Sequence, residues 1–442
     1  MSALPTRFPP GFRWGAATSA HQVEGGNRAN DWWRFEQRPG AIAGGDTSGD
    51  ACRHWQRYDD DFGLAAADGH DLHRLSIEWS RIEPEPGRID AAAVAHYHQV
   101  FASLARHHIT PMVTLFHFTL PAWVADRGGF ENRDTLERFD GFVRLCAREY
   151  GGEVDWWCTV NEPEVYGFRG YSEGTWPPGT RDDSAALAVI ANLLEAHARA
   201  AAILRAEDRV DADGDGHATR IGFAKSWVVF EPSRWWFPPD VIRTRIERGV
   251  YDAAVAMAPA TGRIALAVPG ARPVRRVVDG LRGSVDWMGL NYYTRWRVRM
   301  FAPEPHVATP GAELNDLGWE HHPRGIAVAA AELAKVGVPV LVTENGVADA
   351  ADRLRPRALV ETLMHLGEAI ARGVPVTGYL HWSLLDNFEW VFGFDVRFGL
   401  YAVDFAHPDR PRTRRRAAEV YARVIRANGV DAALAAEVGL AL

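Results

Sequence analysis

Eight short, apolar, β-rich runs recur along this chain, and helix-length segments that are often rich in alanine separate them. The runs cover residues 12–17, 72–77, 110–116, 154–160, 221–226, 287–291, 338–343 and 376–382. Strands that alternate with helices in this way predict parallel β/α units. No change of composition or linker divides the 442 residues, so we expect a single catalytic domain, residues 1–442, built as one α/β (β/α)8 TIM barrel. A plain barrel of this kind needs about 250 residues, which predicts enlarged loops after several strands.

The charge pattern argues against several classes of partner. The net charge is −8 and the sequence pI is near 6.1, so no basic surface for nucleic acid or an anionic membrane is indicated. The one dense basic segment, residues 410–416, is interpreted as a solvated surface. Lys225 and Lys335 are the only lysines, which makes a Schiff-base enzyme an unpromising interpretation.

Cysteine usage and the N-terminal sequence favour a reducing compartment. Cys52, Cys146 and Cys158 form neither a disulfide framework nor a zinc-ligand spacing. No charged N-terminal segment leads into an apolar run, and no uninterrupted apolar stretch is expected to span a bilayer. We therefore expect a cytoplasmic protein that does not insert into membranes.

Polar residues concentrate where the predicted strands end. They are Gln22, His117, Asn161, Glu162, Asn291, Glu344, Asn345 and Glu389. In (β/α)8 barrels the carboxyl ends of the strands carry the chemistry, because these ends all open onto one face. The pattern predicts one site at the mouth of the barrel.

Two glutamates stand out within this set, because each belongs to a Glu-Asn or Asn-Glu pair directly after a buried run. Glu162 precedes Pro163, which stops the strand, and Glu344 lies just before Gly346. Taken alone, Asn161 and Glu162 could equally cap the next helix. Two opposed carboxylates are also the minimum equipment for cleaving a glycosidic bond. A separation of about 5 Å implies retention of anomeric configuration and about 6.5–9.5 Å implies inversion, so the residues alone leave both outcomes open.

Six motifs in order resemble glycoside hydrolase family 1, the β-glucosidase and β-galactosidase family, over nearly the whole chain. They are FRWGAATS at 12–19 followed by Gln22, Glu24 and Gly25; RLSIEWSR at 74–81; TVNEP at 159–163; NYY at 291–293; TENG at 343–346; and WSLLDNFEW at 382–390. The resemblance implies a retaining β-glycosidase that releases a sugar from the non-reducing end by double displacement. It implies β-glucosidase activity, with β-galactosidase and β-fucosidase side activity.

The resemblance also implies roles for the two glutamates. Glu344 would attack the anomeric carbon, and Glu162 would donate a proton to the leaving group and later take one from water. A nearby ionised Glu344 disfavours a second negative charge and so keeps Glu162 protonated until Glu344 is esterified. Arg74, Asn291 and Tyr293 resemble the partners of the nucleophile; the alternative for Arg74 and Tyr293 is a structural ion pair and a core tyrosine.

The same resemblance assigns a sugar pocket. Residues that would contact the sugar are Gln22, His117, Asn161, Tyr293, Trp382, Glu389 and Trp390. Asn161 would hold the 2-hydroxyl, and Trp382 would offer its aromatic face to the ring. Glu389 implies an unphosphorylated sugar, since its charge would repel a phosphate, and Trp319 would form a wall of the aglycone subsite.

Two departures from the family pattern affect these expectations. Phe118 stands where many members have tryptophan, which removes an indole donor and puts contacts around the 3-hydroxyl in doubt. The segment from Arg412 to Arg416 lacks the proline and lysine usual in the family, for which we expect no catalytic effect.

Metal and cofactor motifs are weak. The run DADGDG at 211–216 matches the first half of a calcium-binding EF-hand loop, but the twelfth position is Gly222 and the following run reads as a strand. A polar surface turn is the better interpretation. No zinc-ligand pattern or phosphate-binding glycine loop is found, so neither a metal nor a cofactor is expected.

Two alternatives use the same residues. One is a β-glycosidase that mainly transfers the sugar to another acceptor. The other is a non-hydrolytic sugar-binding member of the fold, which is disfavoured because Glu162 and Glu344 are both present. The expected partners are small β-glycosides or short oligosaccharides; the preferred sugar, the aglycone and the oligomeric state stay open.

Overall fold

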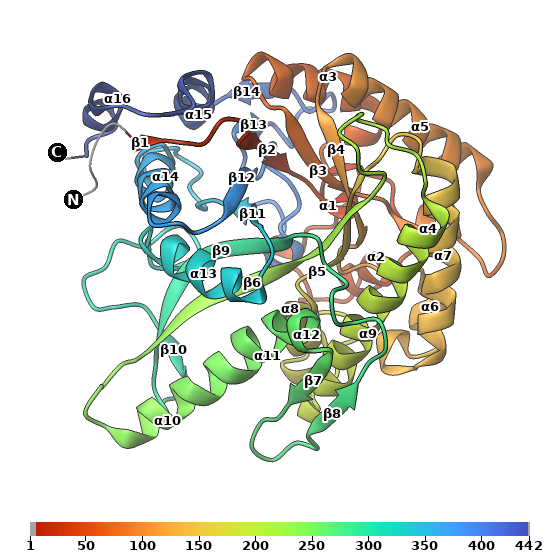
Figure 1. The fold of residues 1–442 in the computed structure, drawn as a ribbon, viewed down its shortest axis with the longest axis horizontal. Helices are drawn as coiled ribbons and strands as arrows, with labels where there is room; N and C mark the ends of the chain where they lie inside the picture. Colours follow the sequence, from red (N-terminus) through yellow and green to blue (C-terminus); the bar gives the residue numbers. More distant parts are fainter. Residues whose placement is uncertain (1–5, 441–442) are drawn as a thin grey trace.

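The computed structural model describes residues 6–440, in which eight parallel strands form a closed barrel surrounded by helices (Figure 1). The barrel strands are β2 (Arg13–Ala17), β3 (Leu72–Ser76), β4 (Thr110–Phe116), β5 (Trp156–Asn161), β6 (Arg220–Pro232), β9 (Met288–Val298), β11 (Val340–Asn345) and β12 (Val376–Trp382). Neighbours in this order pair with one another, β6 pairs with β9, and β12 pairs with β2 to close the ring. Each strand overlaps one of the eight apolar runs, so the predicted (β/α)8 barrel is confirmed.

Helices of different lengths follow the strands and cover the barrel from outside. The longer ones are α3 (His54–Ala67), α5 (Ala91–Arg106), α7 (Asp134–Tyr150), α9 (Asp183–Glu207), α10 (Pro238–Glu247), α13 (Gly325–Leu333), α14 (Arg355–Ala371) and α15 (Arg416–Ala427). Short ones are α1 (Ala20–Val23), α2 (Asp31–Glu36), α4 (Trp79–Ile82), α6 (Ala122–Ala125), α8 (Pro163–Gly167), α11 (Ala254–Ala256), α12 (Ala258–Thr261) and α16 (Ala432–Glu437). Two single turns of π-helix, η3 (Phe168–Ser172) and η4 (Arg248–Ala253), continue α8 and α10.

Small two-stranded pairings lie outside the barrel. β1 (Thr6–Arg7) pairs with β15 (Gly429–Val430), β7 (Arg263–Leu266) with β8 (Val274–Val277), and β13 (Tyr401–Val403) with β14 (Arg412–Arg414). The first of these pairings joins the two ends of the described chain.

Helix α9 is apolar enough to resemble a membrane-spanning helix. Among residues 6–440 it alone has the length and mean hydropathy, 1.5, that would suit a membrane span. However, 78% of its apolar window is buried in the protein. The helix packs beside α7 and α8, and its alanine-rich sequence permits that close packing.

Two strands are longer than predicted. The runs that indicated β6 and β9 end at residues 226 and 291, whereas the strands continue to Pro232 and Val298 and pair with each other along the extension. Beyond the barrel, β9 also pairs in antiparallel fashion with β10 (His306–Val307). Aromatic and β-branched residues favour this extension, which lies beyond the predicted runs.

The arginine segment 410–416 is only in part the solvated surface that was predicted, because Arg414 and Arg416 are exposed whereas the side chains of Arg412 and Arg415 are 3% and 10% exposed. Arg412 donates to both oxygens of Asp61 at 2.7 and 2.9 Å, and Arg415 donates to both oxygens of Asp386 at 2.7 and 2.8 Å. The side chains of Asp61 and Asp386 are 0% and 1% exposed. The prediction was wrong for Arg412 and Arg415, because their counter-ions lie far away in the sequence, in α3 and in the loop after β12.

Candidate active site

The two glutamates lie at the carboxyl ends of β5 and β11. Glu344 is the fifth residue of β11, and Glu162 follows β5 as the residue that caps α8. Glu162 has φ 44° and ψ 63°, a left-handed backbone conformation that is uncommon for a residue with a side chain. Both residues are buried.

Glu344 is held by two strong donors. Arg74 Nη1 donates to Glu344 Oε1 at 2.5 Å, and the Tyr293 hydroxyl donates to Oε2 at 2.7 Å. Arg74 is itself fully buried and is oriented by Thr114 Oγ1 at 3.0 Å and by Asn161 Oδ1 at 2.7 Å. A guanidinium with no access to water is a strong and fixed counter-charge for one carboxylate.

Asn291 connects the two glutamates. Its Nδ2 donates to Glu162 Oε1 at 2.9 Å and to Asn161 Oδ1 at 3.1 Å, and Asn161 Oδ1 also accepts from Arg74. Thr343 Oγ1 donates to Asn291 Oδ1 at 2.6 Å, which fixes the direction of the amide. Glu162 is thus linked through Asn291 and Asn161 to Arg74, which holds Glu344, so both glutamates belong to one hydrogen-bond network at the mouth.

The environments of the two carboxyls differ in charge. Burial, the charge of Glu344 and the charge of Glu164 raise the pKa of Glu162 well above its usual range. Burial also raises the pKa of Glu344, but the Arg74 guanidinium, the Tyr293 hydroxyl and the Asn291 amide oppose that rise. Glu344 therefore ionises before Glu162, which gives one carboxylate and one carboxylic acid.

Gln22 and Glu389 lie together on one side of the site. Gln22 Nε2 donates to Asn387 Oδ1 at 2.9 Å and to Glu389 Oε2 at 3.4 Å, while Ser19 Oγ donates to Gln22 Oε1 at 2.7 Å. Burial and the nearby Glu344 charge raise the pKa of Glu389 to about 8, against hydrogen bonds from Trp382 and Gln22. A carboxyl of this kind can accept or donate a hydrogen bond near neutral pH.

His117 joins the polar and aromatic parts of the site. Its Nε2 lies 3.3 Å from Asn161 Nδ2, and its ring stacks against Trp382 and Trp390 at centroid distances of 6.1 and 6.2 Å. Burial and then the Arg74 charge lower the pKa of His117 well below its usual range, so the ring is neutral. Its buried Nδ1 has no partner within residues 6–440 and remains available to a ligand.

The remaining predicted residues, Trp319 and Asn345, differ in where their side chains point. Trp319 packs edge-on to the Tyr293 ring at 5.9 Å, in a cluster with Phe398 and Trp382. Asn345 points away from the glutamates, because its Nδ2 donates to the Tyr292 carbonyl and its Oδ1 accepts from Tyr379 at 2.8 Å. The structure thus brings every predicted site residue to one mouth except the side chain of Asn345.

Phe118 belongs to an aromatic wall whose further members Trp32 and Trp176 the sequence did not predict. Its ring lies 4.9 Å from Trp176 and 5.4 Å from Trp390, and Trp32 contacts Trp390 at 4.6 Å. Trp176 comes from the loop after η3, where no motif singled it out. Thr114 and Ser19 were also missed, since a hydroxyl that orients another side chain carries no distinctive sequence pattern.

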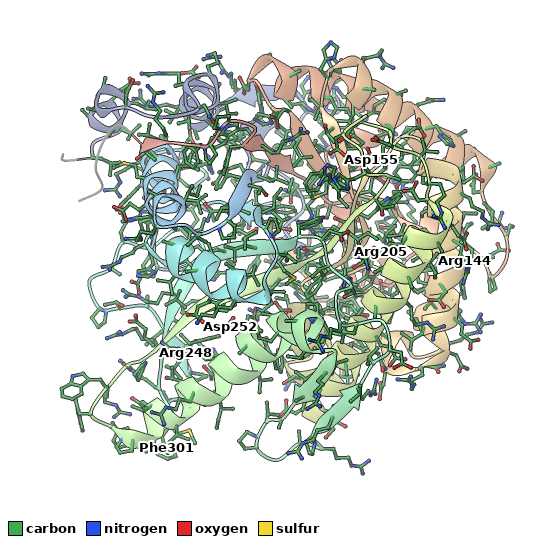
Figure 2. The ribbon with its side chains drawn as sticks, viewed as in Figure 1. Arg144, Asp155, Arg205, Arg248, Asp252 and Phe301 are labelled. Carbon is green, nitrogen blue, oxygen red and sulfur yellow. The ribbon has the colours of Figure 1, made fainter. Side chains whose placement is uncertain are left out.

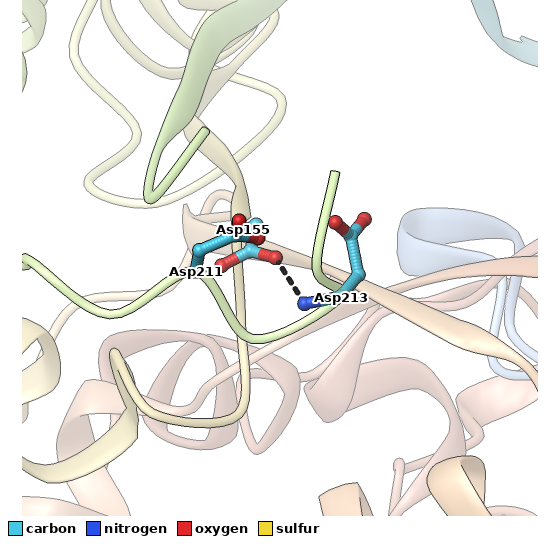
Figure 3. A group of neighbouring side chains, drawn as sticks. All are labelled: Asp155, Asp211 and Asp213. Carbon is cyan, nitrogen blue, oxygen red and sulfur yellow. Dashed lines mark hydrogen bonds between the residues drawn. The ribbon is translucent and has the colours of Figure 1, made fainter. Parts of the chain in front are cut away.

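The acidic turn at 211–216 makes hydrogen bonds of its own. Asp155, Asp211 and Asp213 group together in Figure 3, and Asp213 N donates to Asp155 Oδ2 at 2.8 Å. Asp155 Oδ1 accepts from Ala212 N at 3.0 Å, and Asp211 accepts from three backbone N–H groups, of Gly214, Asp215 and Gly216. The carboxylates of Asp155 and Asp211 serve to close the turn, and Gly222 lies in β6, in agreement with a polar surface turn.

A (β/α)8 barrel whose mouth pairs an arginine-bound carboxylate with a buried carboxylic acid, among amides and tryptophans, defines an O-glycosyl hydrolase. The sequence model of glycosyl hydrolase family 1 matches residues 4–430. The chain is 31% identical over 453 residues to "Beta-glucosidase A" of Thermotoga maritima, covering 96% of this chain and 99% of that protein. It is 30% identical to "Beta-galactosidase" of Pyrococcus woesei, covering 96% and 98%.

Comparison with solved structures also finds β-glycosidases. A β-glycosidase from Pyrococcus horikoshii superposes with a TM-score of 0.89 at 33% identity, covering 99% of both chains. A β-glucosidase from Thermotoga maritima in complex with deoxynojirimycin superposes with a TM-score of 0.87 at 29% identity, covering 96% of this chain and 100% of that one. The chain belongs to glycosyl hydrolase family 1, as the sequence motifs predicted, and is a retaining β-glycosidase.

Proposed function

We propose that Glu344 is the nucleophile and Glu162 the general acid/base of a β-glucosidase with β-galactosidase and β-fucosidase side activity. One observation carries this assignment: Glu344 accepts hydrogen bonds from Arg74 at 2.5 Å and Tyr293 at 2.7 Å, whereas Glu162 accepts from the neutral Asn291 at 2.9 Å. The group that bears the cation stays ionised and can attack. The group without a cation keeps its proton and can donate it.

The reaction follows from these charges. Glu344 attacks the anomeric carbon and the bond to the leaving oxygen breaks, while the Glu162 proton moves to that oxygen. The resulting ester removes the negative charge of Glu344, so Glu162 can now ionise and take a proton from the incoming water. Attack by this water breaks the ester and restores Glu344, with two inversions and net retention.

The residues around the glutamates suit a sugar ring. Gln22, His117, Asn161 and Glu389 offer hydrogen-bond partners for hydroxyls, and Trp382 and Trp390 offer apolar surface. We assign Trp319 to the wall of the aglycone subsite, since it lies against Tyr293 on the side of the Phe398 cluster. Relatives named β-glucosidase and β-galactosidase support small β-glycosides or short oligosaccharides as substrates.

Chemical rescue tests the two roles. Glu162→Ala with an activated β-glucoside and azide should yield the β-glucosyl azide, because azide intercepts the glycosyl-enzyme. Glu344→Ala under the same conditions should yield the α-anomer, because azide attacks the substrate directly. Identical anomers from both variants would overturn the assignment.

The same assay separates the alternatives of transfer and simple binding. A sugar-binding protein without hydrolytic activity would release no nitrophenol, and a transferase would pass the sugar to added alcohol in preference to water.

We propose a reducing, cytoplasmic setting on the basis of Cys52, Cys146 and Cys158, all buried and unpaired. We also propose that residues 1–442 act as one catalytic domain.

A further inference from the structure

A buried ion pair lies close to Glu162, the residue proposed as the general acid/base. Lys225 Nζ donates to Glu164 Oε1 at 3.0 Å, and both side chains are 0% exposed. Glu164 lies in the first turn of α8, two residues after Glu162, and Lys225 lies in β6. Lys225 is one of only two lysines in the chain.

This pair joins the turn that carries Glu162 to the neighbouring strand. Glu164 Oε1 also accepts from Ser226 N at 2.8 Å, and the backbone N of Glu162 donates to the Ala224 carbonyl at 2.8 Å. Three consecutive residues of β6 therefore hold Glu162 and Glu164 from one side. Lys225 additionally donates to the Ser226 carbonyl.

The backbone of Glu162 needs such support. Its left-handed conformation, φ 44° and ψ 63°, is unfavourable for any residue with a β-carbon and persists only where surrounding contacts impose it. Pro163 follows, so the chain cannot relax by continuing the strand. The hydrogen bonds from β6 are the contacts that impose it.

The pair is poorly explained by stability alone. Burying two charges costs about as much as their attraction returns, and apolar replacements of similar size are often as stable. Glu164 Oε2 is moreover buried without a hydrogen-bond partner within residues 6–440. The second carboxylate near Lys225 is Asp252 of η4, at 3.3 Å, labelled in Figure 2. Two carboxyls thus compete for one ammonium, and burial raises the pKa of Asp252 to about 7 against the attraction of Lys225.

We propose that Glu164 and Lys225 are positioning residues for proton transfer: their ion pair clamps the turn after β5 to β6 and so fixes the Glu162 carboxyl against the leaving oxygen. The proposal rests on the acid/base role proposed above for Glu162. The Glu164 charge acts in the same sense, because it is among the causes that raise the pKa of Glu162, after burial and Glu344.

Other charged or titratable groups also face Glu162. They are Arg74 from β3, Tyr251 from η4, Tyr293 from β9 and Glu344 from β11. A substitution at residue 164 replaces none of these side chains, but after burial the Glu164 charge also raises the pKa of Tyr251, so the dependence on the leaving group carries the test together with the pH profile.

The test compares leaving groups in the variant Glu164→Gln, which has nearly the same shape. A dinitrophenyl β-glucoside departs without protonation, whereas a phenyl or alkyl β-glucoside needs the acid. We expect kcat/KM to fall roughly tenfold or more for the phenyl substrate, a part of the 10²–10⁴-fold that general acid catalysis supplies, and about twofold or less for the dinitrophenyl substrate. The basic limb of the pH profile should move to lower pH, because loss of a negative charge lowers the pKa of Glu162.

Asp61→Asn is the matched control. Asp61 is a buried carboxylate paired with Arg412 at 2.7 Å, outside the site, so its loss should lower the melting temperature without changing the dependence on the leaving group. Lys225→Met should reproduce the leaving-group effect and serves if Glu164→Gln fails to fold. Equal losses on both substrates, an unchanged pH limb, or insolubility of both variants would overturn the proposal. If instead the wild-type chain fails to cleave glucosides, or azide fails to rescue Glu162→Ala, it is the proposed function that fails.

Discussion

Removing the Tyr293 hydroxyl should change the pKa of Glu344, the proposed nucleophile. In Tyr293→Phe, Glu344 Oε2 loses the donor that lies 2.7 Å away, while Arg74 stays bound to Oε1. The carboxyl is buried, so water cannot fully replace the lost hydrogen bond. The ionised form of Glu344 is therefore destabilised relative to the protonated form.

The size of the effect follows from the energy of one hydrogen bond to a charged group. That energy is about 1.5–3 kcal/mol, and about 1.4 kcal/mol corresponds to one pKa unit. We expect the pKa of Glu344 to rise by roughly 1–2 units. Since Glu344 must be ionised to attack, the acidic limb of kcat/KM should move to higher pH by the same amount. The basic limb, which reports Glu162, should move little, because Glu344 is ionised in that range in both proteins.

The assay is a pH profile of kcat/KM on a nitrophenyl β-glucoside. Tyr292→Phe is the matched control, because the adjacent hydroxyl instead donates to the His322 carbonyl at 2.7 Å, outside the site. That control should leave both limbs unchanged. An acidic limb that stays in place in Tyr293→Phe, or moves to lower pH, would refute the proposal that the Tyr293 hydroxyl stabilises the ionised form of Glu344.

Two further predictions concern the loop after β12. Glu389→Ala should lower kcat/KM about 10–100-fold towards a glucoside, which is about 1.5–3 kcal/mol for the hydrogen bonds that its buried carboxyl would make, and much less towards a fucoside, which lacks the 6-hydroxyl. Equal losses on both sugars would contradict a contact with that hydroxyl. Arg415→Met should lower the free energy of unfolding in urea by about 3–5 kcal/mol, because Asp386 stays buried without its two-pronged partner. A loss below about 1 kcal/mol would mean that Arg397, 3.7 Å from Asp386, is a sufficient counter-charge.

The barrel and most of its mouth could be predicted because their signals are local. A buried parallel strand is a continuous apolar run, and its carboxyl end is the next residue along the chain. Glu162 and Glu344 were singled out in this way, and the roles proposed for them come from the family motifs. Asn345 was placed wrongly in the site, since one step along a strand turns a side chain to the opposite face.

Features that depend on distant partners could not be predicted. The partner of Arg412 is 351 residues away, so a run of arginines that is largely paired in the structure looked like a solvated surface. The pair of Lys225 with Glu164 spans 61 residues. The lysine itself was a signal, since a charged side chain inside an apolar run requires a buried acid as its partner. The neighbouring sequence, however, did not indicate which acid that is.

The closure of the barrel also sets when the enzyme can first exist. Residues 13–17 of β2 form their second strand pairing with residues 378–382 of β12, and Thr6–Arg7 pair with Gly429–Val430. During synthesis the ring therefore stays open until the last strand has left the ribosome. Asp61 of α3 and Asp386 of the loop after β12 gain their ion-pair partners later still, when Arg412 and Arg415 have been synthesised. A chain that stops before residue 378 would hold Glu162 and Glu344, the proposed catalytic pair, and yet have no closed barrel in which to use them.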